Sequence, residues 1–120
     1  MNVTDLLDEC VATLQPFAQT VNVGSQRWNG TAYVPVTKPQ IGDIYASAWA
    51  ASLRTAAQFL NLQEKPTESQ IALLRNLLFG GMGTFQDFQL DTKRWGAEAH
   101  AANVRLEQLR AKLFKSLSHD

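Results

Sequence analysis

At 120 residues the chain has the length of one domain, and we expect a single helical domain over residues 1–120. Hydrophobic residues make up 45% and charged residues 18%, which excludes an intrinsically disordered chain. Eleven basic and eleven acidic side chains give a formal net charge of zero, so no overall field favours nucleic acid or a membrane surface as the partner.

The N-terminal segment indicates the cellular compartment of the protein. Cys10 is the only cysteine, so no intramolecular disulfide forms, and this usage is typical of a reducing compartment. Asp5 and Asp8 stand where a secretory signal would carry basic residues, and no apolar run reaches membrane-spanning length. The sequence therefore predicts a cytoplasmic protein without a membrane segment.

The first predicted helix begins at Thr4, a residue type that caps helix N-termini. Its apolar stripe recurs at helical spacing and comprises Leu7, Val11, Leu14 and Ala18. Cys10 falls on the same apolar side, which favours a buried thiol over a nucleophile. Pro16 lacks an amide hydrogen and predicts a kink or an early end of the helix.

Residues 22–42 interrupt the helical pattern and predict an exposed loop or a β-hairpin. The pair Asn29-Gly30 lies between β-prone residues, which is a strong hairpin signal. Pro35 and Pro39 exclude a long central strand. A connection of this length is unusual in a compact domain unless it has a function.

Two helices follow. Asp43 is the expected N-cap of one, whose broad apolar face comprises Ala48, Trp49, Ser52, Leu53, Ala56, Phe59 and Leu60. Thr67 and Gln70 form a capping box at the start of the other. That helix ends at Gly80, expected to be its C′ glycine, and its apolar stripe comprises Ile71, Leu74, Leu77 and Leu78.

The last predicted helix runs from about Thr92 to about Ser118, with Gly96 weakening its first turns. Its strong apolar stripe comprises Ala99, Ala102, Leu106, Leu109, Leu113 and Leu117. Basic residues of this end, among them Arg105, Lys112 and Lys115, are interpreted as solvated or as complementing the acidic first helix. The predicted fold class is all-α, a small bundle of about four helices with a hairpin or extended loop between the first two.

A glycine-rich stretch, Gly80-Gly81-Met82-Gly83-Thr84-Phe85-Gln86-Asp87-Phe88, resembles a phosphate loop at first sight. A phosphate loop lies between a strand and a helix and ends in a lysine, whereas these glycines follow a helix and no lysine comes next. We predict a structural turn in which Gly80, Gly81 and Gly83 take positive φ angles. Thr84 and Asp87 then hydrogen-bond the turned backbone, while Phe85 and Phe88 enter the core.

No constellation of catalytic residues is visible. His100 and His119 have no histidine or cysteine at metal-ligand spacing, and the carboxylates are scattered singly. We therefore predict no catalytic residues, no metal and no cofactor. Arg27, Trp28 and Tyr33 of the hairpin are the candidate partner-binding residues, because these residue types dominate binding energy at protein interfaces. The alternative is that their aromatic rings pack back on the helices.

The stretch Leu78-Phe79-Gly80-Gly81-Met82-Gly83-Thr84-Phe85-Gln86-Asp87 resembles the L-Y/F-G-G-M-G-S-L/F-N-D signature of a family of small bacterial helical proteins of unknown function. Asn103 with Leu106, Leu109 and Arg110 is similar to that family's N-x-x-L-x-x-L-R helix, and Trp49-Ala50 with Leu53 also agrees. Gln86 departs from the pattern, which has Asn there, and the hairpin lies outside it. The resemblance implies a helical fold and no established activity. Some small bacterial proteins of this kind are encoded beside secreted toxins and resemble immunity proteins.

Three hypotheses follow. The first is a non-enzymatic protein-binding module of a bacterium, whose specific form is an immunity protein that neutralises a toxin. The second is a structural or regulatory homo-oligomer, in which the apolar last helix packs on its copy. The third is an enzyme built around the glycine turn and Asp87.

Overall fold

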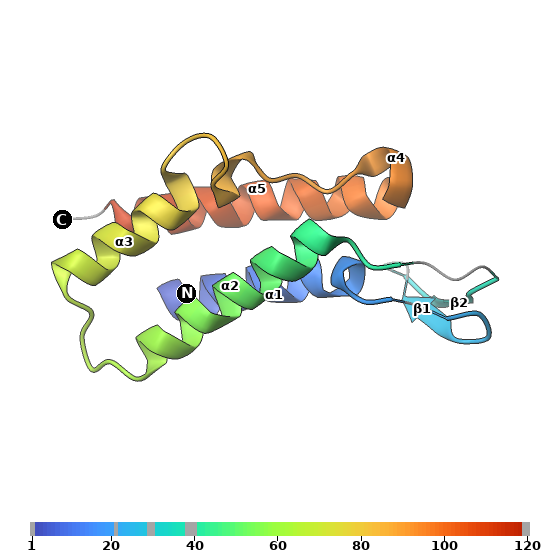
Figure 1. The fold of residues 1–120 in the computed structure, drawn as a ribbon, viewed down its shortest axis with the longest axis horizontal. Coiled ribbons are helices and arrows are strands. Elements are labelled where there is room, and N and C mark those ends of the chain that lie inside the picture. The colour runs from blue at the N-terminus through green and yellow to red at the C-terminus, as the bar shows by residue number, and fades with distance from the viewer. Residues whose placement is uncertain (1, 21, 29–30, 38–40, 119–120) are drawn as a thin grey trace.

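The computed structural model describes residues 2–20, 22–28, 31–37 and 41–118. In these ranges the chain forms α-helices and one two-stranded antiparallel hairpin (Figure 1). The prediction of a mostly helical chain with a hairpin between its first two helices is confirmed. In chain order the elements are α1 (Val3–Ala18), β1 (Gln26–Trp28), β2 (Tyr33–Pro35), α2 (Ile44–Asn61), α3 (Glu68–Phe79), the 3-10 helix η1 (Phe85–Asp87), α4 (Thr92–Trp95) and α5 (Ala97–Leu117).

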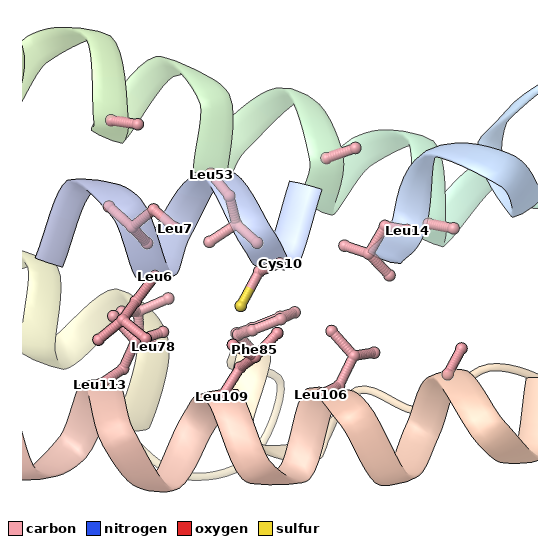
Figure 2. Packing of buried hydrophobic residues seen from close by; sticks show 14 of the residues in the cluster. Leu6, Leu7, Cys10, Leu14, Leu53, Leu78, Phe85, Leu106, Leu109 and Leu113 are labelled. Carbon is pink, nitrogen blue, oxygen red and sulfur yellow. The ribbon is translucent and has the colours of Figure 1, made fainter. Parts of the chain in front are cut away.

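Helix α1 is the central layer of the bundle. It lies between α2 on one side and α5 on the other, and α3 lies against the C-terminal half of α5 (Figure 1). Figure 2 shows Leu7 and Leu53 at the contact of α1 with α2, and Leu6, Cys10 and Leu109 at the contact of α1 with α5. Burial of these side chains is the main favourable term in folding. The molecule is elongated, 49 × 27 × 23 Å, because the long helices run parallel to one axis.

The helix starts follow the capping chemistry of the sequence, with one shift. Thr67 and Gln70 form the predicted box, with Gln70 N donating to Thr67 Oγ1 at 3.2 Å and Thr67 N donating to Gln70 Oε1 at 2.8 Å. Asp43 caps α2 as predicted and accepts from two backbone amides. The expected cap at Thr4 is wrong. Asn2 caps α1 instead, because its Oδ1 already accepts from Asp5 N at 2.8 Å.

The end of α1 meets the start of α2. The helix continues through Pro16 to Ala18, so Pro16 itself does not end it. Asp43 N then donates to Phe17 O at 2.7 Å, which joins the two helices. A Cβ at Gly42 would stand 2.4 Å from Ala18 O, so only glycine fits this close crossing.

The last predicted helix is broken in two. Gly96 has a φ of 69°, outside the helical region, and separates α4 from α5. The sequence alone predicts only that Gly96 weakens the first turns of a continuous helix. The break leaves the apolar stripe of α5 as predicted, and Ala99, Ala102, Leu106, Leu109, Leu113 and Leu117 are all buried.

The predicted apolar face of α2 is rotated from the observed one. Leu53 and Leu60 are buried, but Ala48, Ser52 and Phe59 face solvent, and Ala46, Ala50 and Ala57 lie in the core instead. The small alanines let α1 approach closely, so they occupy the buried side at the expense of larger residues. In α3, Leu74 and Leu78 are buried while Leu77 is exposed, because α3 makes its main contacts with α5 and η1.

Candidate functional site

The hairpin register sorts its side chains onto two faces. Arg27 pairs with Val34 and Trp28 pairs with Tyr33, so four residues connect the strands. Asn29 and Gly30, the expected turn pair, lie outside the described residues. Directly opposite residues share a face and successive residues alternate. Trp28 and Tyr33 therefore lie on one face of the ribbon, and Arg27 lies on the other.

Arg27 holds the hairpin against the bundle. Its guanidinium forms a 2.8 Å ion pair with Glu98 at the start of α5. Its central carbon also lies 5.2 Å from the ring centroid of Trp95 and 5.7 Å from that of Phe17. Those two rings contact each other edge to face at 5.6 Å. Partial removal from water strengthens the Coulombic attraction of this pair, and the aromatic rings add a cation–π attraction.

Trp28 and Tyr33 form an exposed aromatic pair on the opposite face. Their ring centroids are 5.2 Å apart in an edge-to-face arrangement, and the residues are 50% and 66% exposed. A groove of about 520 Å³ opens beside Trp28, between the end of α1 and the first strand. Its lining is rich in side-chain amides and includes Gln15, Gln19, Asn22 and Gln26. The structure thus brings Trp28 and Tyr33 together and turns Arg27 away from them.

The glycine turn uses its three glycines for two reasons. Gly81 and Gly83 have φ angles of 109° and 82°, in the region that favours glycine, as predicted. Gly80 does not: it ends α3 as the C-cap with a φ of −78°, so Gly81 occupies the C′ position instead. A side chain does not fit at Gly80, because an added Cβ would lie 2.4 Å from Asn76 O. Thr84 Oγ1 donates to Gly81 O at 2.6 Å, as predicted.

The segment after the turn is pinned to α5 by two polar side chains. Arg110 is buried, donates to Phe88 O, and places its guanidinium carbon 4.5 Å from the ring centroid of Phe85. Asn103 Oδ1 accepts from Leu90 N at 2.8 Å, and its Nδ2 donates to Leu90 O at 3.1 Å. Phe85 is fully buried and Phe88 half-buried, as predicted.

By its position among the basic residues of the C-terminal end, Arg110 is expected to be solvated, but it is buried. The resemblance contains a hint of this contact. Arg110 belongs to its N-x-x-L-x-x-L-R motif, and the glycine turn belongs to its other motif. Charge alone gave no such signal, because a single arginine beside a leucine stripe is normally solvated.

The candidate catalytic residues are scattered. Asp87 is exposed, and its carboxylate makes no hydrogen bond within the described residues, so only its backbone amide supports the turn, by donating to Thr84 O at 3.1 Å. It lines an open cleft of about 420 Å³ with Asp43 and Asp91, which cap α2 and α4. His100 is exposed on α5, and His119 lies outside the described residues. The described residues contain no group of three or more side chains able to hold a metal ion.

Cys10 is fully buried, as predicted. Burial raises the pKa of its thiol to about 12, against the opposing effect of the Arg110 charge. A thiol held in its neutral form is a poor nucleophile and a poor metal ligand, so the role of Cys10 is packing.

Comparisons with protein-family models, with curated proteins and with solved structures find no match for this chain. In the part of the chain that the structure describes, no helix combines the length and the apolar character needed to cross a membrane.

Replacing any glycine of the turn with alanine should lower the free energy of unfolding by about 1 kcal/mol or more. At Gly81 and Gly83 the cause is the positive φ, and at Gly80 it is the contact with Asn76 O. Thermal melts of the three variants measure the effect. Unchanged melting in all three would show that the turn relaxes without cost.

The free energy of unfolding should depend on pH through the buried thiol of Cys10. The folded pKa of Cys10 lies above its ordinary value of 9.0, so the unfolded chain releases this proton first as the pH rises. Its contribution is intact below about pH 9 and declines between pH 9 and 12 by up to about 1.4 kcal/mol per pH unit. Urea titrations of the wild type and of Cys10→Val across this window test it. The difference between the two proteins should change with pH, and a constant difference would contradict the burial effect.

Proposed function

We propose that this chain is a non-enzymatic protein-binding module that recognises its partner with the hairpin face formed by Trp28 and Tyr33. The observation that carries the proposal is the exposed aromatic pair itself. Two large rings left half in water lose much of the free energy that their burial would provide. A partner that covers them recovers it, which is why tryptophan and tyrosine dominate interface energetics.

The hairpin is ordered before any partner arrives. Arg27 fixes the rear face of the ribbon through Glu98 and the rings of Phe17 and Trp95. Cross-strand contact with Tyr33 restricts the Trp28 ring in turn. A preordered binding face loses little conformational entropy on association, so more of the contact energy appears as affinity.

The groove beside Trp28 indicates the kind of partner surface. Side-chain amides both donate and accept, so Gln15, Gln19 and Gln26 suit the backbone of an extended polypeptide segment better than a charged ligand. The zero net charge means that association should depend little on salt.

A bacterial toxin is the specific partner that the resemblance to small toxin-associated proteins implies, and neutralising it would make this chain an immunity protein. The compartment we propose is the cytoplasm, supported by the single buried cysteine. We propose no cofactor and no nucleic acid partner. The structural or regulatory homo-oligomer stays the alternative. Because the apolar stripe of α5 is buried within the chain, its contact with a copy would need another surface.

Trp28→Ala should leave the melting temperature nearly unchanged and weaken the complex with the partner by about 2 kcal/mol, roughly thirtyfold. The partner would be captured with the tagged chain from a lysate of the source organism, identified, purified and titrated by calorimetry.

Phe114→Ala is the matched control, because Phe114 is as exposed as Trp28, at 51%, but lies near the end of α5. Equal losses of affinity in both variants, or none in Trp28→Ala, would show that the hairpin is not the binding face. A large fall in melting temperature with Trp28→Ala would show that the hairpin only covers the bundle.

A further inference from the structure

The outward face of α2 carries no charge. Arg54 is the only charged residue in this helix of 18 residues, and it turns toward α1, where its Nη2 donates to Gln15 Oε1 at 2.7 Å. The side of α2 opposite the core consists of exposed uncharged residues, namely Ile44, Tyr45, Ser47, Ala48, Ala51, Ser52, Thr55, Gln58, Phe59 and, just past the end, Leu62. A solvated helix face normally carries charged residues, so this face has the composition of a covered one.

An apolar groove runs along one edge of this face. It has a volume of about 360 Å³ and lies between α2 and α3. Phe59 and Ala56 line it from α2, and Leu73 and Leu77 line it from α3. Phe59 is 48% exposed and Leu73 is 69% exposed. The uncharged face of α2 and this groove form one continuous surface, because Ser52, Thr55 and Phe59 belong to both.

The face is self-complementary in side-chain size. Small residues occupy its middle, and large ones occupy its two ends. About a point between Ala51 and Ser52, Ala48 corresponds to Thr55 and Ile44 to Phe59. At the edge of the face, Tyr45 corresponds to Gln58. Thr55 Oγ1 donates to Ala51 O within the helix at 2.9 Å, so its hydroxyl needs no further partner and its methyl group is free for packing.

We propose that two copies of this chain associate through α2 in an antiparallel, twofold-symmetric dimer. An isologous interface requires a surface that is complementary to itself under a twofold rotation. Rotation about the midpoint of α2 places small residues against small ones, so that the helices approach closely, and places Ile44 of each copy against Phe59 of the other. With a net charge of zero and an uncharged face, nothing repels a second copy.

The length of α2 limits the surface area that this dimer interface can bury. At 1.5 Å per residue α2 is about 27 Å long, and with the flank of α3 it presents about 450 Å² in projection to a partner. A standard interface buries about 800 Å² of accessible surface on each side, so this one falls toward the small, weaker end of specific interfaces. We expect dissociation constants in the micromolar range.

Sedimentation velocity of the full chain, from about 1 to about 500 µM, tests the association. The wild type should shift from the mass of the chain to twice that mass. Ala51→Glu places two carboxylates beside each other at the twofold axis and should raise the dissociation constant about a hundredfold or more. Ala101→Glu is the matched control, since it makes the same change at an exposed alanine of α5 and should leave the dimer intact.

Cysteine crosslinking tests the antiparallel arrangement. Differently tagged Ile44→Cys and Phe59→Cys chains should form a mixed disulfide, whereas Ile44→Cys alone should form none, and native Cys10 is buried and does not compete. A monomeric wild type over the whole concentration series, a dimer that survives Ala51→Glu, or efficient crosslinking of Ile44→Cys to itself would each overturn the proposal. Trp28→Ala should not affect this dimer, so the two proposed surfaces succeed or fail separately.

Discussion

The hydrogen bond from Arg110 to the Phe88 carbonyl closes the bundle, and the connection between α3 and α4 depends on it. A guanidinium inside a core is costly unless its charge is compensated, and within the described residues Arg110 forms no ion pair. A backbone carbonyl and the face of the Phe85 ring supply the compensation. Both come from one turn of chain, so these two contacts form only when that turn is folded against α5.

The glycines just before this turn serve the same closure. The chain leaves α3 at Gly80 and must reverse within four residues to insert Phe85 beside Cys10 and Leu109 (Figure 2). Positive φ angles at Gly81 and Gly83 make that reversal short. Asn103 lies about two turns before Arg110 on α5 and hydrogen-bonds both backbone groups of Leu90. At the other end of the bundle Arg27 acts similarly on the hairpin, so an arginine holds each of these two segments to the helices.

Local chemistry explains what the sequence could predict. The capping box of Thr67 and the cap at Asp43 involve residues three apart or less, and the stripe of α5 repeats regularly, so both are visible without a structure. The burial of Arg110 and the ion pair of Arg27 with Glu98 join residues distant in sequence, which no local pattern contains. The rotated face of α2 had the same cause. Its alanines are ambiguous between core and surface, and only the approach of α1 decides which side is buried.

The hydrogen bond from Asp43 N to Phe17 O has a consequence for how such a chain can vary. The chain leaves α1 and re-enters α2 at one point, where Gly42 lies against the Ala18 carbonyl and Gly42 N donates to Thr20 Oγ1 at 3.3 Å. Everything between is an excursion with a fixed base, and closing a longer loop on a fixed base costs little extra entropy. The length of the excursion can therefore vary at little entropic cost, whereas exchanging β1 would remove the contacts of Arg27 with Glu98, Phe17 and Trp95.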